Sequence, residues 1–168
     1  MPNNIANKLV VNARTKAEID NFLSAIIGIE GGEMLHIDFE KIAPTPECES
    51  KDWYDWRITN WGTKWNAYKT EIDSCSDGSV EIYFCTANDG AIPIIKKLVE
   101  KYPHLEFIYK YADEVIANNC GEIYGIDGSV SLKFPEDESD EAMALYIECW
   151  QQEWENFKKT EDGWDWKD

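Results

Sequence analysis

Hydrophobic and polar positions follow two spacings in the first 134 residues, and these spacings succeed one another in a definite order. Residues 5–12 contain the continuous apolar run Leu9-Val10-Val11, which is typical of a central strand. Thr15 then forms a capping box with the glutamate three residues later, and the apolar residues after it recur every three or four positions. The pattern therefore predicts a strand followed by a helix that ends near the first glycines.

After an insert, the chain again shows patterns typical of strands and a helix. Residues 66–73 and 80–84 are predicted as two strands that meet at the turn Asp77-Gly78, since both turn residues tolerate a positive φ. A second helix with one apolar face follows, and the alternating residues 105–111 form the next strand. The order β-α-insert-β-β-α-β predicts an α+β fold, a ferredoxin-like split βαβ antiparallel sheet with helices on one face.

Two additions to this core are predicted. Within the insert, residues 34–42 favour a short strand, and the tryptophan-rich residues 53–60 favour a short helix. After the core, Asp127-Gly128 separates the two strand-like runs of residues 121–134. A two-residue connection of this composition is the strongest hairpin signal in the chain, so an added β-hairpin is expected there.

Composition changes at Pro135. Residues 135–168 contain twelve acidic residues but only three lysines, so they carry nine of the 17 net negative charges. Apolar residues recur in this stretch at helical spacing: Met143, Tyr146, Ile147, Trp150, Trp154 and Phe157. The chain is thus divided into a ferredoxin-like α+β domain over residues 1–134 and an acidic amphipathic C-terminal helical extension over residues 135–168.

The apolar stripe of this extension needs a surface to pack on, because a lone charged helix is marginally stable in water. One interpretation is that the helix covers the open face of the sheet. The other is that it binds a partner protein. The residues that would make the partner contact are aromatic anchors and neighbouring carboxylates: Tyr146, Glu148, Trp150, Glu153 and Trp154.

The overall composition restricts the classes of partner. A net charge of −17 and a pI near 4.4 disfavour direct contact with nucleic acid or an anionic membrane, and favour a protein partner with a basic surface. Five cysteines lie scattered without a paired spacing, which indicates reduced thiols in a cytoplasmic protein. No apolar run approaches the length of a membrane span. These observations are also compatible with a homo-oligomer.

Four of the eight tryptophans fall within residues 53–68, WYDWRITNWGTKWNAY. The last nine residues of this stretch resemble the NWGTKWNAY motif of proteins with a YubB-type ferredoxin-like domain, which occur on plasmids, phages and genomic islands. Further segments fit the same family, at residues 2–7, 37–44 and 111–121. The resemblance covers residues 1–126. It implies a ferredoxin-like fold with no iron–sulfur cluster and no particular activity.

The tryptophan motif admits a structural and a functional interpretation. In the structural one, the tryptophans are core anchors, and the neighbouring asparagines and glycines satisfy turns and backbone groups. In the functional one, five residues converge on a ligand-binding pocket: Trp61, Lys64, Asp113, Asn118 and Cys120. Because a buried lysine needs a carboxylate partner, we expect Lys64 to pair with Asp113 or Glu114.

Catalytic chemistry has little support in the sequence. His36 and His104 are the only histidines, and both positions suit a surface residue. A dyad of Cys120 with either histidine would require the fold to bring them together. The sequence has no metal-ligand spacing and no glycine-rich phosphate loop, so no catalytic residue, metal or cofactor is predicted.

These observations favour a binding protein over an enzyme. The leading hypothesis is a cytosolic, mobile-element-encoded module that binds another macromolecule, in the first place a basic protein. In a variant of this hypothesis, carboxylates of the acidic tail imitate nucleic-acid phosphates and inhibit a host protein. The alternative is a small-ligand-binding protein or enzyme that uses the Trp61–Cys120 region. A third hypothesis is a structural dimer formed through an open sheet edge or face.

Overall fold

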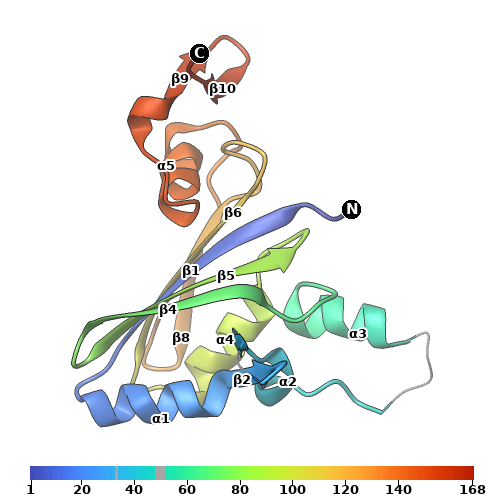
Figure 1. Cartoon of the computed structure of the whole chain (residues 1–168), viewed down its shortest axis with the longest axis vertical. Coiled ribbons are helices and arrows are strands. Elements are labelled where there is room, and N and C mark those ends of the chain that lie inside the picture. Colours follow the sequence, from blue (N-terminus) through green and yellow to red (C-terminus); the bar gives the residue numbers. More distant parts are fainter. Residues whose placement is uncertain (33, 48–51) are drawn as a thin grey trace.

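The computed structural model describes residues 1–32, 34–47 and 52–168, and its centre is a six-stranded antiparallel sheet (Figure 1). Four strands and two helices follow the ferredoxin-like order: β1 (Asn4–Asn12), α1 (Lys16–Ile26), β4 (Tyr68–Ser76), β5 (Ser79–Ala87), α4 (Ile92–Lys101) and β6 (Glu106–Asp113). The strand order β4-β5-β1-β6 places the first and last strands of the core side by side. This arrangement is the split βαβ sheet, so the predicted fold class is confirmed.

Both core helices lie on one face of the sheet, below it in Figure 1. The capping box at the start of α1 is formed as predicted. The Thr15 hydroxyl accepts from the backbone N–H of Glu18 at 3.3 Å, and the Glu18 carboxylate accepts from the backbone N–H of Thr15 at 3.1 Å. Two otherwise unpaired N–H groups of the first turn are thereby satisfied.

The added hairpin is also present. It consists of β7 (Gly121–Ile126) and β8 (Ser129–Lys133), which extend the sheet beyond β6. Both residues of its turn have positive φ, 52° at Asp127 and 76° at Gly128, as a type I′ turn requires. The full sheet therefore has β4 at one edge and β8 at the other.

Among its described residues, the insert between α1 and β4 contains four short elements: β2 (Ile27–Glu30), β3 (Met34–Ile37), α2 (Phe39–Ile42) and α3 (Asp52–Trp61). The strand predicted over residues 34–42 is only half correct. It ends at Ile37, because the Asp38 carboxylate accepts from the backbone N–H of Glu40 at 3.1 Å and so caps α2. The helix predicted in the tryptophan-rich stretch is confirmed as α3.

The acidic tail is a helix for only part of its length. After α5 (Asp140–Cys149) come a 3-10 turn η1 (Trp154–Asn156) and the strands β9 (Phe157–Thr160) and β10 (Gly163–Trp166). The prediction of one continuous helix through Phe157 was therefore wrong. Gln151 adopts a φ of 51°, which is incompatible with a continuing α-helix, and the last apolar positions belong to a hairpin instead.

Two clusters of buried side chains lie on opposite faces of the sheet. The helix-side core fills the space between the sheet and the helices α1 to α4, with Leu9, Phe22 and Trp61 among its members. The α5-side core lies under the tail helix and contains Ala6, Ala112 and the apolar residues of α5. Strand residues alternate between the two, as the period of two along a strand requires. Figure 1 shows α5 on the face opposite α1 and α4.

Candidate functional site

Trp61, the centre of the tryptophan motif, is a core residue. Its side chain is fully buried, and its Nε1–H donates to the carbonyl of Ala43 at 2.8 Å. The ring packs edge-on against Phe39, with centroids 5.6 Å apart, and the Arg57 guanidinium lies 4.4 Å from the ring centroid. Every polar and apolar part of the side chain thus has a partner inside the protein, which favours the structural interpretation of the motif.

The polar residues after Trp61 join separate segments of the backbone. The Thr63 hydroxyl donates to the carbonyl of Ala87 at 2.8 Å and accepts from its N–H at 3.2 Å. The Asn66 side chain accepts from the backbone N–H of Phe39 at 2.8 Å and donates to the Asp38 carboxylate at 2.8 Å. The motif therefore fixes α2 and the end of β5 to the turn before β4 by hydrogen bonds.

Lys64 does not pair with either carboxylate that the sequence suggested. Its Nζ lies 4.5 Å from the centroid of the Trp65 ring, which is an exposed cation–π contact. Asp113 instead accepts from the Asn3 side chain at 3.1 Å and from the backbone N–H of Val115 at 2.9 Å. Glu114 accepts from the Asn4 side chain at 2.9 Å. The expected pair of Lys64 with Asp113 or Glu114 was wrong.

The five residues of the predicted ligand pocket are divided between the two faces of the sheet. Trp61 belongs to the helix-side core and Cys120 to the α5-side core. Asp113, Asn118 and Cys120 do lie together, since the Cys120 thiol is 3.3 Å from the carbonyl of Asn118 and the N–H of Asp113 donates to that same carbonyl. The structure thus supports no pocket that combines Trp61 with Cys120.

Cys120 is poorly suited to act as a nucleophile. Burial, together with the neighbouring Asp137 and Asp113, raises the pKa of its thiol to about 12. At neutral pH the group is a protonated thiol, whereas the reactive form is the thiolate. Among the described residues, no cluster of histidine, cysteine and carboxylate side chains has the arrangement that holds a metal ion.

One buried polar network was missed by the sequence analysis. The Asn7 side chain, 1% exposed, donates to Thr86 Oγ1 at 3.0 Å and accepts from the Tyr109 hydroxyl at 2.6 Å. The same hydroxyl accepts from the backbone N–H of Ala91, which begins α4 without a side-chain cap. The available signal was an asparagine at a core-facing position of a strand, where a polar side chain requires partners. The network is structural, because each of its groups is satisfied internally.

The tail helix α5 docks on the open face of the sheet through a shared carboxylate. Glu148 accepts from Lys8 at 3.0 Å and from Lys110 at 2.7 Å, and these two lysines are direct cross-strand neighbours on β1 and β6. Partial burial opposes ionisation of Glu148, but the hydrogen bonds from Lys110 and Lys8 outweigh it and lower the pKa of the carboxyl. Glu148 therefore serves as an internal ion-pair partner rather than a free contact for another protein.

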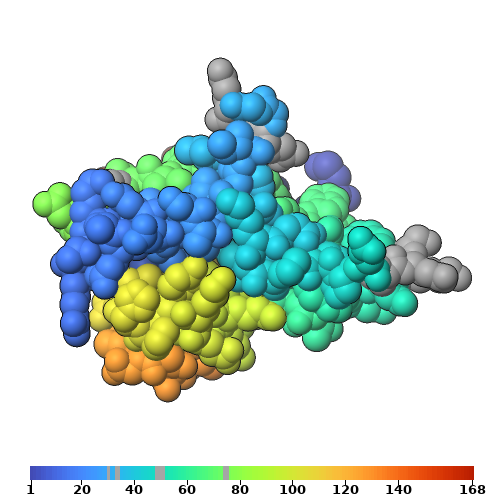
Figure 2. All heavy atoms as spheres, turned by 90° about the horizontal axis from the view of Figure 1, so that it is seen from below, coloured from blue at the N-terminus to red at the C-terminus, as the bar shows by residue number. Residues whose placement is uncertain are grey.

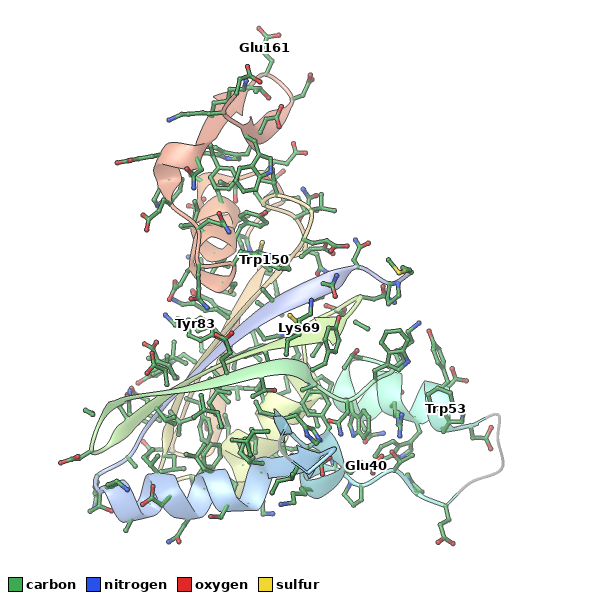
Figure 3. The ribbon with its side chains drawn as sticks, in the orientation of Figure 1. Glu40, Trp53, Lys69, Tyr83, Trp150 and Glu161 are labelled. Carbon is green, nitrogen blue, oxygen red and sulfur yellow. The ribbon has the colours of Figure 1, made fainter. Side chains whose placement is uncertain are left out.

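Two predicted aromatic anchors also turn inward. Tyr146 is buried in the α5-side core. Trp150 is partly buried, and its Nε1–H donates to the carbonyl of Asp113 at 2.9 Å, at the sheet end of α5 (Figure 3). Of the five residues predicted to bind a partner, only Glu153 and Trp154 remain exposed. The part of the tail that covers the sheet and the part that is exposed to solvent are therefore different segments.

The exposed part of the tail is an aromatic hairpin. The rings of Trp154 and Trp164 meet at 5.7 Å between centroids, and those of Phe157 and Trp166 at 4.4 Å. Lys159 on β9 bonds to Asp140 of α5 at 2.6 Å and thereby ties the hairpin to the helix. The signal for this hairpin in the sequence was the alternation around Asp162-Gly163, where Gly163 has a φ of 124°.

The exposed residues of this hairpin and of the turn before it include two large rings and six carboxylates. Trp154 and Trp166 are each 47% exposed. We call the following exposed residues the hairpin surface: Glu153, Trp154, Glu155, Glu161, Asp162, Asp165, Trp166 and Asp168. Figure 3 places Glu161 at the outermost tip of the molecule, far from the sheet. Exposed tryptophan rings amid acidic side chains are the composition of a protein-contact surface.

Comparison with known proteins identifies the class of fold. Residues 64–163 match the family model described as the ferredoxin-like domain in Api92-like protein. The match spans more than half of the chain, so the chain belongs to this family of ferredoxin-like proteins. It continues through α5 and most of the terminal hairpin, beyond residue 126 where the sequence resemblance ends. Residues 135–163 of the tail therefore fall within the match.

Among solved structures, the chain is similar to the protein Api92 from Yersinia pseudotuberculosis. The two share 12% sequence identity and a TM-score of 0.41, and the alignment covers 49% of this chain and 30% of that chain. This chain therefore spans less than a third of the length of that protein. No curated protein matches the sequence. Within the described residues, no helix is long and apolar enough to cross a membrane.

Proposed function

We propose that this protein binds a partner protein with a basic surface, and that the hairpin surface makes the contact. The observation that carries the proposal is the pair of tryptophans, each 47% exposed, on a hairpin that projects away from the sheet (Figure 1). Burying two such rings against a partner would supply anchoring area. The six carboxylates around them would guide a basic surface during association.

The local charge supports a basic partner over a neutral one. Residues 153–168 contain six acidic side chains against three lysines, and two of these lysines, Lys158 and Lys159, are paired with Asp168 and Asp140. Attraction between such exposed groups is screened by salt, over a Debye length of about 10 Å at 0.1 M. The complex should accordingly weaken as the salt concentration rises. Imitation of nucleic-acid phosphates by these carboxylates is a special case of the same proposal.

We further propose that the protein is cytoplasmic and encoded by a mobile element. The support for this origin is the resemblance of residues 60–68 to the YubB-type motif of plasmid, phage and island proteins. Support for the cytoplasm comes from the cysteines, of which Cys85, Cys120 and Cys149 are free thiols. Gene neighbourhoods with replication or integration functions, and recovery in the soluble cytoplasmic fraction, are the corresponding tests.

The experiment that tests the contact compares three forms of the protein as immobilised baits. They are the wild type, the double variant Trp154→Ala/Trp166→Ala, and Trp65→Ala as a matched control that removes a similarly exposed ring elsewhere. Partners are captured from nuclease-treated lysate, purified, and titrated against each form at low and high salt. We expect at least about tenfold weaker binding for the double variant, and wild-type binding for Trp65→Ala.

The same titrations can overturn the proposal. Equal affinity of all three forms for every purified partner would exclude the hairpin surface as the contact. An affinity that is independent of salt would exclude the electrostatic part, including the imitation of phosphates. Circular dichroism of each variant confirms beforehand that the fold is retained, as expected for changes at exposed positions.

A further inference from the structure

The two edges of the central sheet differ in how well they are protected. At the β4 edge the register shifts between Tyr68 and Glu71 and again between Asp73 and Ser76, and the short strand β3 lies alongside. Such irregularities prevent another strand from pairing there. The β8 edge has none of them: its five residues pair with β7 in one continuous register. In the described chain, β8 is the final strand of the sheet order and has one neighbour.

The hydrogen-bonding groups on the free side of β8 can be assigned from the turn. In a two-residue type I′ hairpin, the residues that flank the turn exchange both backbone hydrogen bonds, here Ile126 and Ser129. Backbone hydrogen bonds to β7 are then made by every second residue of β8, namely Ser129, Ser131 and Lys133. The N–H and C=O groups of Val130 and Leu132 point away from the sheet, where they are available to a further strand.

Apolar side chains alternate with polar ones along this edge, and the stretch carries little charge. Leu132 is 39% exposed and Phe134 is 56% exposed, both on the side of the sheet that α4 occupies. Figure 2 shows the orange atoms of the β7–β8 region at the rim of this face, beside the yellow α4. Between residues 128 and 135 the single charged residue is Lys133, in a chain with 33 acidic residues. The carboxylates that cover the rest of the molecule are absent from this stretch of sequence.

We infer that the β8 edge pairs with the β8 edge of a second copy of this chain, antiparallel, with Ser131 on the twofold axis. In this register, Val130 of one copy and Leu132 of the other exchange backbone hydrogen bonds, in both directions. The result is a continuous twelve-stranded sheet with α4 of each copy on the same face. Because the contact is isologous, it closes after two copies.

Two side-chain contacts make the edge complementary to itself in this register. Phe134 of one copy lies opposite Gly128 of the other, and a side-chain atom at Gly128 would meet only Pro103, at 3.7 Å. In the monomer the Phe134 ring lies over Gly121 of its own chain. Turned outward, the ring has room to cover Gly128 of the second copy, a recognised means of stabilising a strand pair. Lys133 of one copy lies diagonally across from Asp127 of the other, so opposite charges meet twice in the dimer.

The expected dimer is weak and its salt dependence is distinctive. One strand pair with its flanking side chains is smaller than a standard interface of about 1,600 Å², so we expect a Kd of roughly micromolar order. The two copies repel through 17 net negative charges each, and salt screens this repulsion. Self-association should thus tighten with salt, whereas binding of a basic partner by the hairpin surface should weaken.

The test is sedimentation equilibrium over a range of concentrations, with the wild type and Leu132→Pro. Proline at residue 132 removes an N–H that points outward and leaves the bonds to β7 in place, since proline is tolerated on edge strands in that orientation. We expect the wild type to show a monomer–dimer equilibrium and Leu132→Pro to dissociate at least tenfold more readily. Leu132→Thr, which keeps the N–H, is the matched control and should retain most of the association.

Substitutions at Ser129 test the register itself, because Ser129 lies opposite Lys133 of the second copy. Ser129→Glu should tighten the dimer and Ser129→Lys should weaken it, each by a few-fold. A general effect of net charge would have the opposite sign for both. A wild type that remains monomeric at all concentrations and salt levels would overturn the inference. So would unchanged association of Leu132→Pro, or effects at Ser129 that follow net charge alone.

Discussion

The eight tryptophans are divided equally between two regions, and the most buried ring lies in one region while the two most exposed rings lie in the other. In the stretch of residues 53–65, Trp61 is fully buried, bonded to a backbone carbonyl and stacked with an arginine. In the tail, Trp154 and Trp166 are each 47% exposed on a projecting hairpin. A similar density of tryptophan thus forms part of the core in one region and, in the other, the surface that we propose as a partner contact. The difference lies in where the surrounding polar groups find their partners.

In the first region those polar groups bond to the protein itself. Arg57 donates to Glu40 at 3.0 Å and to the carbonyl of Lys64 at 3.3 Å, and Asn66 bonds to α2. In the tail, the carboxylates of the hairpin surface point to solvent around exposed rings. Buried rings whose neighbouring polar groups are hydrogen-bonded inside the protein stabilise the fold, whereas exposed rings among solvated charges contribute little stability. Substitutions in the two regions should therefore separate stability from binding.

The largest expected effect on stability is at Trp61. Trp61→Ala leaves a large cavity in the helix-side core and an unpaired carbonyl at Ala43, so we expect a loss of about 3–5 kcal/mol in the free energy of unfolding. Urea denaturation followed by circular dichroism measures this change. If the alanine variant does not fold, Trp61→Phe, which retains a ring but lacks the Nε1–H, should lose about 1–2 kcal/mol. A stable, unaffected Trp61→Ala would contradict the role of the motif as a core.

An intermediate effect is expected where the tail meets the sheet. Glu148→Gln removes the charge that Lys8 and Lys110 share and leaves two cross-strand lysines that repel each other. We expect a loss of about 1–2 kcal/mol in the free energy of unfolding. Glu153→Gln is the matched control, since Glu153 is exposed on the same tail and should change stability by no more than about 0.5 kcal/mol. Equal effects of the two variants would show that the ion pairs do not hold α5.

The same ion pairs predict a pH dependence with a defined sign. The pKa of Glu148 is lowered in the folded protein from its ordinary value of 4.5, so its contribution is present above that value and is lost as the pH falls through the folded pKa. Burial opposes ionisation of Lys8, but Glu148 outweighs it and raises the lysine pKa above 10.5. The contribution of Lys8 is thus present below pH 10.5 and lost above the folded pKa. The stability difference between wild type and Glu148→Gln should shrink as the pH is lowered from 7 to 3, measured by urea titration.

The sequence allowed most of the sheet to be predicted, because its strands and helices depend on local patterns. The capping box at Thr15, the turn at Asp127-Gly128 and the order of elements all depend on nearby residues. The site was less predictable. The ion pair of Lys8 with Glu148 joins residues that are 140 positions apart. A pattern of neighbouring residues therefore could not predict it. The tail was misassigned because Trp154 and Phe157 continue a helical spacing across Gln151, whose left-handed backbone ends it.

The smallest expected effect on stability is at Trp154, and it completes the contrast with Trp61. The ring contacts Trp164 but remains nearly half exposed, so Trp154→Ala should lower the free energy of unfolding by only about 0.5 kcal/mol. Urea denaturation of Trp154→Ala and Trp61→Ala compares their losses in the free energy of unfolding. Titration with the partner compares their losses in binding affinity. A loss at Trp154 as large as that at Trp61 would mean that the hairpin is part of the folded core. Its exposed rings would then stabilise the fold, and the case for a contact surface would fail, because a residue that the fold requires cannot be assigned to a partner from its exposure alone.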